Sequence, residues 1–276
     1  MNTKRLISII TIISSLSLFA TTADAQPGRT VDCDRGDSIQ AAIDKQVGHT
    51  GPIEIFINGT CNENVVISRD SIHLTSNSNA VLSGEILIDG AKRITLSSFQ
   101  VTGPGNGVIG NNNSDVDLRD MVITGNQGLM GVGSNVGSYV EVYDSTISNN
   151  QNWGLNVTNG ATLGVDHTDV INNTNINIRA DANSSLYILN GSTISGSTGD
   201  GIHVILNSSA WLQDTAITGN TSTGIFVQYD GSVRFNHNVT VSGNGGAGID
   251  CQDTESSFIN LGASLADSVN CTDFNQ

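Results

Sequence analysis

The amino-acid sequence predicts an all-β fold, a right-handed, three-sided parallel β-helix of about nine to ten coils with a short N-terminal capping helix. Three observations predict this fold. A repeat of about 23 residues runs along the chain, each repeat holds three short apolar runs of period two, and Gly, Asn, Ser and Asp separate the runs. The expected organisation is a signal peptide at residues 1–25, an N-terminal cap at 26–52 and the β-helix at 53–276.

The repeat emerges when the chain is aligned on itself, with successive spacings between 22 and 25 residues. The aligned positions are Ile72, Ile94, Val116, Val140, Leu163, Leu186, Trp211, Val233 and Phe258. Leucine-rich repeats have a similar length, but their fixed leucine ladder and helical half-repeat are absent from this sequence. A three-sided coil of strands is therefore the better interpretation.

The corner after the second strand of each coil is expected to need a left-handed backbone. Two residues after an apolar strand end comes only Gly or Asn, the residue types that adopt positive φ at least cost. These positions are Gly103, Gly125, Asn149, Asn172, Gly196, Gly219 and Gly243. Asn follows directly at five of the corners, Asn126, Asn150, Asn173, Asn220 and Asn244. Stacked coils would bring these amides ~4.8 Å apart, so the sequence predicts a hydrogen-bonded asparagine ladder.

The third strand is expected to begin with Gly, once Asn, followed by an inward apolar residue. The pairs are Gly107-Val108, Gly128-Leu129, Gly154-Leu155, Asn175-Ile176, Gly201-Ile202, Gly224-Ile225 and Gly248-Ile249. At ~1.5–3 kcal/mol per buried aliphatic side chain, the column of Val, Ile and Leu offsets the entropy of ordering the turns only when coils stack.

Both ends of the column are expected to be protected. Residues Asp37 to Lys45 predict a short amphipathic helix with Asp37 as N-cap, which would cover the first coil. Cys251 and Cys271 occupy equivalent inward positions of successive coils, and the ~4.8 Å spacing of strands lies within the Cα range of a disulfide. By elimination, Cys33 pairs with Cys61 and ties the cap to the first coil.

Export and charge limit the partners. Lys4 and Arg5 precede an apolar run that ends at Ala23-Asp24-Ala25, so cleavage is expected near Ala25 and the protein is expected to be extracellular, at the cell surface or in the periplasm. No later segment approaches the ~20 apolar residues of a membrane-spanning helix. After cleavage, 9 basic residues face 25 acidic ones, which excludes nucleic acid as a partner. An acidic polysaccharide would need bound Ca²⁺ or a local basic patch.

The segment Asn58-Gly59-Thr60-Cys61-Asn62-Glu63-Asn64-Val65-Val66-Ile67 is similar to the G-T-x-x-E-x-x-x-I element at the start of pectin-lyase-like right-handed β-helices. The resemblance covers nearly all of the chain after the signal peptide. It implies a superfamily of polysaccharide lyases, polygalacturonases, uronan epimerases, tailspikes and adhesins, and it places enzyme sites on the outer face of the Gly-apolar strands. Fold does not specify reaction.

On that face, one outward row is expected to run through Ile109, Met130, Asn156, Asn177, His203, Phe226, Asp250 and Asn270. A second row would hold Asn111, Val132, Thr158, Arg179, Ile205, Gln228, Gln252 and Thr272. Because sugars combine apolar faces with hydroxyl edges, the candidate substrate-binding residues are Trp153, Asn177, Phe226, Gln228 and Tyr229. The alternative is an ordinary solvated sheet face.

Four residues are candidates for catalysis: Asp200, His203, Arg179 and Asp250. The segment Asp200-Gly201-Ile202 resembles part of the polygalacturonase pattern N-T-D-G-I, which implies an acid or base at Asp200, but the Asp-Asp, G-H-G and R-x-K elements are absent. Register places Asp250 roughly 14 Å from Asp200, beyond the ~6.5–9.5 Å of inverting glycosidases. Arg179 is the candidate base of a β-elimination lyase, in which Ca²⁺ would stabilise the enolate.

No two histidines share a metal-ligand spacing, so no metal site is assigned. Acidic and amide residues recur just after the first strand, at Asp120, Asp144, Asp166, Asn190, Asp214 and Asn236. They are expected to cap turns, with a Ca²⁺ ladder as the alternative.

The leading functional hypothesis is a secreted or cell-surface β-helix that contacts carbohydrate without a recognisable catalytic set. The alternatives are a lyase or hydrolase of uronate polymers and a structural adhesin.

Overall fold

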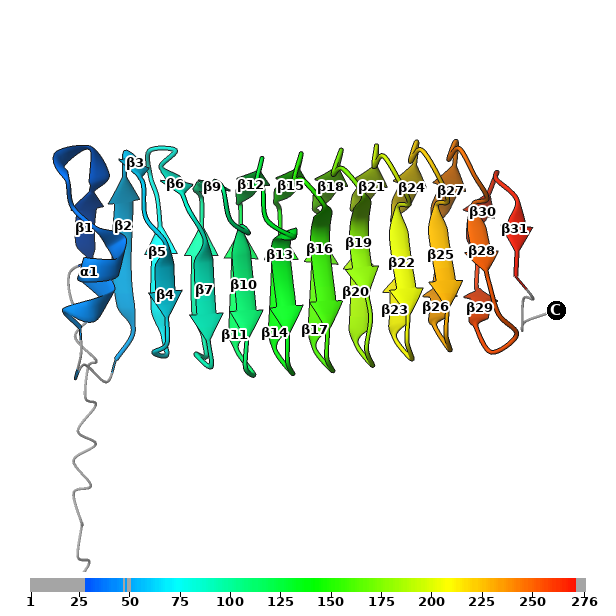
Figure 1. Ribbon diagram of the computed structural model, residues 1–276, viewed down its shortest axis with the longest axis horizontal. Helices are drawn as coiled ribbons and strands as arrows, with labels where there is room; N and C mark the ends of the chain where they lie inside the picture. Colours follow the sequence, from blue (N-terminus) through cyan, green and yellow to red (C-terminus); the bar gives the residue numbers. More distant parts are fainter. Residues whose placement is uncertain (1–27, 47, 49–50, 272–276) are drawn as a thin grey trace, which may run out of the picture.

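The computed structural model describes residues 28–46, 48 and 51–271, so the predicted signal peptide lies outside the described residues. The described chain winds as an elongated stack of coils with the capping helix at one end (Figure 1). Every coil contributes one strand to each of three parallel sheets, which have 11, 10 and 10 strands. The predicted three-sided parallel β-helix is confirmed.

Sheet A is the 11-stranded sheet, and β1 precedes the capping helix in the chain. In stacking order its strands are β1 (Arg29–Asp32), β2 (Ile53–Asn58), β5 (Ile72–Thr75), β8 (Ile94–Ser97), β11 (Asp115–Arg119), β14 (Tyr139–Tyr143), β17 (Thr162–Asp166), β20 (Ser185–Leu189), β23 (Ser209–Leu212), β26 (Ser232–Phe235) and β29 (Ser257–Asn260). Sheet B follows sheet A within each coil. Its strands are β3 (Thr60–Cys61), β6 (Val81–Ser83), β9 (Gln100–Thr102), β12 (Val122–Thr124), β15 (Thr146–Ser148), β18 (Asp169–Ile171), β21 (Thr193–Ser195), β24 (Ala216–Thr218), β27 (Thr240–Ser242) and β30 (Ser264–Leu265).

Sheet C carries the third strand of each coil. Its strands are β4 (Val65–Ile67), β7 (Ile86–Asp89), β10 (Val108–Asn111), β13 (Met130–Asn135), β16 (Trp153–Thr158), β19 (Ile176–Ala180), β22 (Ile202–Ile205), β25 (Ile225–Gln228), β28 (Ile249–Cys251) and β31 (Val269–Asn270). Alternate residues of every sheet face the same interior, as Leu163 and Val165 of β17 do. Together these side chains form one continuous apolar core along the stack.

The predicted corners are confirmed. All seven Gly and Asn residues named for the turn after sheet B have positive φ, from 55° at Asn149 to 151° at Gly103. The asparagine that follows points inward. Asn126 donates from Nδ2 to Asn150 Oδ1 at 2.9 Å, and Asn150 donates to Asn173 Oδ1 at the same distance. Because these amides are buried, the hydrogen bonds satisfy polar groups that would otherwise lie unpaired in the interior.

The glycines that open sheet C leave room for this ladder. A Cβ atom on Gly154 would lie 2.5 Å from the Asn173 amide nitrogen, and one on Gly201 would lie 2.7 Å from that of Asn220. The ladder residue is missing in one coil, where Ser197 takes its place and donates from Oγ to Asn220 Oδ1. In the preceding coil Asn177 occupies the glycine position and spans the gap, accepting from Asn173 Nδ2 at 2.9 Å and donating to Asn220 Oδ1 at 3.0 Å.

Three predicted alignments were wrong by one to three residues. Ala210, not Trp211, occupies the core position of sheet A, since Ala210 pairs with Leu186 and Val233. The pair Gly131-Val132 replaces Gly128-Leu129, because the turn after Gly125 is one residue longer than the later turns. Asn177-Ile178 replaces Asn175-Ile176, since Ile178 pairs with Leu155. The second outward row consequently loses Val132, which is buried, and Arg179, which belongs to the first row.

The N-terminal end is covered by a short 3-10 helix (Cys33–Arg35) and by helix α1 (Ile39–Asp44), whose Ile39, Ala42 and Ile43 are buried. The predicted N-cap was wrong by one residue. Ser38, not Asp37, caps α1, with its side chain accepting from the Ala41 amide at 3.1 Å. No helix in the described ranges is both long and apolar enough to cross a membrane.

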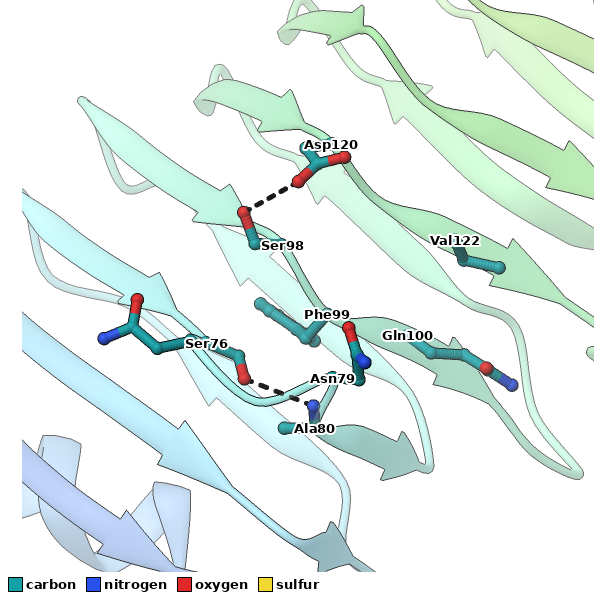
Figure 2. A pocket seen from close by; sticks show the side chains of 9 residues that line it. Ser76, Asn79, Ala80, Ser98, Phe99, Gln100, Asp120 and Val122 are labelled. Atoms are coloured by element: carbon teal, nitrogen blue, oxygen red, sulfur yellow. Dashed lines mark hydrogen bonds between the residues drawn. The ribbon is translucent and has the colours of Figure 1, made fainter.

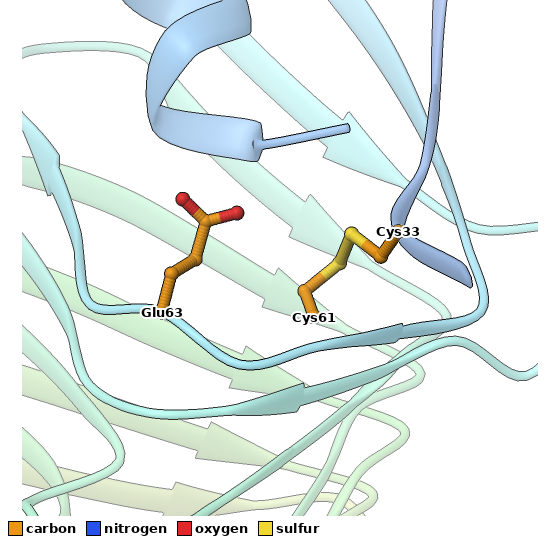
Figure 3. A group of neighbouring side chains, drawn as sticks. All are labelled: Cys33, Cys61 and Glu63. Atoms are coloured by element: carbon orange, nitrogen blue, oxygen red, sulfur yellow. A yellow bond between two sulfur atoms is a disulfide. The ribbon is translucent and has the colours of Figure 1, made fainter. Parts of the chain in front are cut away.

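Both predicted disulfides are present. Cys33 joins Cys61 beside the capping helix, and Cys251 joins Cys271 at the other end of the stack, each with a Cα–Cα distance of 5.0 Å. Figure 3 shows the first bond next to Glu63. The Glu63 carboxylate accepts from the Ile39 amide at 2.7 Å and from Ser38 Oγ at 2.7 Å, so this side chain fixes the start of α1 to the first coil.

Candidate functional site

The candidate site lies on the outer face of sheet C, where one residue per strand points outward in a single row. Register pairs place these residues side by side from β16 to β28: Asn156, Arg179, His203, Phe226 and Asp250. Neighbouring strands are ~4.8 Å apart, so side chains of adjacent members can contact each other. The sequence predicted this face and four of these five positions in its first row, and the correction brings Arg179 between Asn156 and His203.

Arg179 is held between an aromatic ring and a carboxylate. Its guanidinium lies over the Trp153 ring, 4.6 Å from the centroid, and pairs with Asp181 at 2.6 Å. Asp181 comes two residues after Arg179, directly after the end of β19, and its carboxylate reaches the guanidinium on the same face. A paired, stacked guanidinium is a fixed cation, not a free proton acceptor, because arginine keeps its proton in proteins.

The His203 ring is hydrogen-bonded to the carboxylate of Asp200, which lies three residues earlier, just before β22. The distance between His203 Nε2 and Asp200 Oδ2 is 2.5 Å, and Asp200 Oδ1 accepts from the Thr223 amide at 2.7 Å. Burial raises the pKa of the Asp200 carboxyl. The hydrogen bonds from His203, Ser222 and Thr223, together with the His203 charge, outweigh burial, so the pKa lies below its ordinary value. Asp200 therefore remains an anion that orients the imidazole, and a neutral ring donating from Nε2 carries its lone pair on Nδ1.

Phe226 extends the row beyond the histidine. Its ring lies 4.8 Å from the His203 ring, with 34° between the planes. Gln228 is two residues further along β25 and shares this outer face, while Tyr229 lies in the corner that follows, with more than half of its surface exposed. The face thus presents stacked rings beside amide, carboxylate and cationic groups.

Asp250 is not brought to the Asp200–His203 pair. It lies in the row two strands beyond His203, with Phe226 between them. Its carboxylate accepts from Gln252 and Asn270 instead. The wide separation expected from register agrees with this arrangement, and Asp250 takes no part in the site described below.

Asn177 was predicted to face outward as a substrate-binding residue, and that orientation was wrong. Its side chain is fully buried, and both amide atoms are used in the asparagine ladder. Met130 was also misplaced in the first row, where Gly133 stands next to Asn156. Gly133 has no side chain, and Met130 Sδ lies 2.6 Å from the position that a Cβ atom would take there.

Sequence reasoning gave too little weight to two polar residues. Asn156 and Asp181 are buried, and one side-chain oxygen of each has no hydrogen-bond partner among the described residues. The Trp153 ring nitrogen is in the same state. Less than 1 Å² of each of these atoms is exposed, so a ligand would reach them only if neighbouring side chains moved. The spacing of two residues from Arg179 to Asp181 was the available signal, and it was obscured by the misalignment of the outward rows.

Two other parts of the surface were tested as sites. A hollow of about 520 Å³ lies at the corner between sheets A and B, where Ser98 Oγ donates to Asp120 (Figure 2). Apart from Asp120, its lining is uncharged. The corner acids and amides bond to neighbouring side chains, as Asn190 does to Asp166 and Asp214 does to Asn238, both at 2.8 Å. The expected side-chain to backbone caps are not among the hydrogen bonds that these residues form within the described chain, but positive φ at Asp120, Asp144, Asn190 and Asp214 places them in the turns.

Cys33, Cys61 and Glu63 also lie within 4.8 Å of one another. Their grouping does not fit a metal centre, because the sulfur atoms form a disulfide and the carboxylate holds α1. On sheet C, the side chains described above can stack against rings, form hydrogen bonds and, at His203, transfer a proton.

Comparisons with known proteins agree with this architecture. The family described as the right-handed beta helix region matches residues 84–204. No curated protein sequence matches the chain. Among solved structures, the A-module of the Azotobacter vinelandii mannuronan C-5 epimerase AlgE6 is similar with a TM-score of 0.61 and 13% identity, covering 82% of this chain and 70% of that one.

The chain has the right-handed parallel β-helix fold. Two further structures share it at low identity. Pectate lyase Pel9A has a TM-score of 0.59 and 12% identity, covering 88% of this chain and 78% of that one. The enzymatically active domain of bacteriophage CBA120 tailspike protein 2 has a TM-score of 0.64 and 13% identity, but this β-helix covers only 43% of that chain.

Proposed function

We propose that this β-helix binds a polysaccharide on the outer face of sheet C. The glycan face is defined as Trp153, Asn156, Arg179, Asp181, His203 and Phe226. The observation that carries the proposal is the continuous row in which the Trp153–Arg179 stack lies next to the His203–Phe226 stack. Rings offer apolar surface to the faces of sugars, and the partly exposed Arg179 and His203 side chains offer polar groups to the hydroxyls.

The charged groups of the face are paired with one another. The whole chain has a formal net charge of −15, which would repel a polyanion. Arg179 and His203 are adjacent in the row, but the Asp181 and Asp200 carboxylates lie against them, so a carboxylate polymer would bind with Ca²⁺ or by displacing one of these carboxylates. The known proteins of similar fold include a mannuronan epimerase, a pectate lyase and an alginate lyase, which supports uronate polymers as the first ligands to test.

The proposed setting is outside the cytoplasm, after cleavage near Ala25. Two disulfides with no free cysteine among the described residues are typical of an oxidising compartment. Sizing the N-terminus of the protein recovered from its native host would test the cleavage.

Calorimetric titration against polyuronates and neutral glycans, with and without Ca²⁺, tests the binding. Trp153→Ala and Phe226→Ala should each weaken binding by at least about fivefold, since buried aromatic contacts dominate interfaces. Trp211→Ala is the matched control, because Trp211 also lies under an arginine, Arg234, but on sheet A. Equal affinity of Trp153→Ala and the unmodified protein, or no affinity for any glycan, would contradict the proposal.

A second candidate function is proton abstraction from a uronate, as in a lyase or epimerase. The observation that favours it is the oriented Asp200–His203 pair next to the fixed cation of Arg179. His203 would accept the proton, and Arg179 would offset charge on the substrate carboxylate. Product release from uronate polymers should then be lost in His203→Ala. Binding with no product in the unmodified protein would leave the first function and exclude the second.

A further inference from the structure

Three of the four tyrosines of the chain gather on the opposite side of the molecule, on the outer face of sheet A. Tyr139 and Tyr143 come from β14, and Tyr187 comes from β20, with β17 between these strands. They border a hollow of about 230 Å³. Its lining is completed by Glu141, Gly164, Val165, Asp166 and Leu189. We call Tyr139, Glu141, Tyr143, Gly164 and Tyr187 the tyrosine cage.

The hollow exists because β17 contributes no side chain at its centre. Gly164 stands in register between Glu141 and Tyr187, and its φ does not require glycine. A Cβ atom there would lie 3.2 Å from Glu141 Cγ. Any larger residue would fill the space between the Glu141 carboxylate and the Tyr187 ring. The glycine is therefore explained by the hollow above it and not by backbone conformation.

The hydroxyl groups and the carboxylate are mutually arranged. Tyr139 and Tyr143 donate to different oxygens of Glu141, which lies between them on β14. Burial and the negative charges of Glu141, Asp117 and Asp115 raise the pKa of Tyr139 well above its usual value. Both phenols thus donate to one carboxylate, and the Tyr139 hydroxyl keeps its proton. Two tyrosine rings are fixed at the wall of the hollow as a consequence.

The surroundings favour a positive guest. Asp166 lines the hollow in addition to Glu141, whereas Asp115 and Asp117 lie one strand further away on β11, where Asp117 pairs with Arg119 at 2.8 Å. Arg119 already places its guanidinium over the Tyr143 ring, 4.6 Å from the centroid, but its strand β11 lies on the far side of β14 from the hollow. The ring face of an aromatic side chain attracts cations, and several rings with a carboxylate are the recognition pattern for organic ammonium groups.

We propose that the tyrosine cage binds a small organic ammonium group, either quaternary or a protonated amine. The hollow is smaller than the ~300–1,000 Å³ of pockets for drug-sized ligands, which matches a single charged head group. A hard metal ion fits less well, since Ca²⁺ needs six to eight oxygen ligands and rings form most of this wall. The site lies on another sheet from the glycan face and does not depend on the function proposed for that face.

Choline is the first probe, and its uncharged carbon isostere 3,3-dimethylbutan-1-ol is the matched ligand control. Saturation-transfer NMR and calorimetric titration should show saturable choline binding and much weaker binding of the isostere. Glucosamine compared with N-acetylglucosamine tests an amino sugar as the source of the cation, and co-sedimentation with phosphatidylcholine vesicles tests a lipid head group. If N-acetylglucosamine bound as tightly as glucosamine, and both bound more tightly than choline, the site would recognise the sugar and the ammonium assignment would be overturned.

Variants decide whether the cage is responsible. Tyr187→Leu and Glu141→Gln should each weaken choline binding by about fivefold or more, while Tyr187→Phe keeps the ring and should keep most of the affinity. Trp211→Ala, an exposed ring on the neighbouring strand outside the cage, should leave the affinity unchanged. Circular dichroism of each variant confirms folding. Unchanged affinity in folded Tyr187→Leu, or no saturable binding of choline or glucosamine, would refute the site.

Discussion

A single buried asparagine shows how this fold tolerates a defect in its repeat. The ladder position held by Asn173 and Asn220 is occupied by Ser197 in the coil between them, and serine cannot reach both neighbours. Asn177 spans the gap from the opposite side of the turn. The two substitutions relative to the regular repeat, Gly to Asn at one position and Asn to Ser at the other, compensate for each other in space.

This compensation predicts a strong coupling between positions 177 and 197. Asn177→Gly removes the four hydrogen bonds of the Asn177 side chain, including those with the buried amides of Asn173 and Asn220, which should cost at least about 1–3 kcal/mol of unfolding free energy. Ser197→Asn alone would crowd the Asn177 side chain. The double variant restores the regular ladder and should recover most of the loss, as measured by urea unfolding of all four proteins. Additive effects in this cycle would contradict the interpretation.

At the scale of elements, the short helix α1 depends on a residue from the first coil. Glu63 accepts hydrogen bonds from Ser38 and from the Ile39 and Gln40 amides, so its carboxylate joins the cap to the end of β3. The covered edge consists of the first strands of the stack, whose unpaired groups would otherwise invite association. The similarity of the Gly59 to Ile67 segment to other β-helices thus has a local physical explanation.

Glu63→Ala should loosen the cap while leaving the stack intact. Each lost hydrogen bond to the charged carboxylate should lower the free energy of unfolding by no more than about 3 kcal/mol. The Cys33–Cys61 disulfide limits how far the capping segment can move. Hydrogen exchange should rise in α1 and β1 and stay unchanged beyond β8. Glu85→Ala, a substitution of an acidic residue in the next coil away from α1, is the control. Uniformly faster exchange along the chain would argue that Glu63 supports more than the cap.

The strands and corners were predictable because their signals are local. Alternation fixes which side chains point inward, and the Gly or Asn two residues after each sheet B strand fixes the turn. The candidate site was less predictable, because its rows depend on the length of each turn. One additional residue after Gly125 displaced Met130 and Gly133, and the asparagine at 177 hid the true start of β19. The tyrosine cage was not predicted, because its residues come from three strands of sheet A and the resemblance places enzyme sites on sheet C.

The whole molecule is a one-dimensional stack in which each coil contacts its neighbours, so its stability depends on the sum of coils and on both ends. The two ends are closed differently. The N-terminal end has a helix and a disulfide, whereas the last coils rely on the Cys251–Cys271 bond and on Asp267. Asp267 ends the asparagine ladder, accepting from the Asn244 amide at 2.9 Å and from its side chain at 3.0 Å.

Acid should therefore weaken the C-terminal part of the stack first. The pKa is lowered at four described carboxyls, all beyond residue 199: Asp200, Asp214, Asp253 and Asp267. At Asp267 the hydrogen bond from the Asn244 amide is the main cause. A group with a lowered folded pKa stabilises the protein above the ordinary value of 3.8 and loses that contribution as the pH falls through the folded pKa.

Urea unfolding as a function of pH, combined with pepsin cleavage mapped by mass spectrometry, tests this expectation. The range from pH 5 to pH 3 spans the ordinary pKa of aspartate, about 3.9. Across this range the free energy of unfolding should fall, and the first pepsin cleavages should appear after residue 199. Asp267→Asn cannot ionise, so it should be less stable at neutral pH and lose less on acidification, because its end of the ladder no longer binds an additional proton on unfolding. If that variant and the unmodified protein lost stability in parallel, or if cleavage began in the N-terminal coils, the ladder end would not be the acid-sensitive part of the molecule.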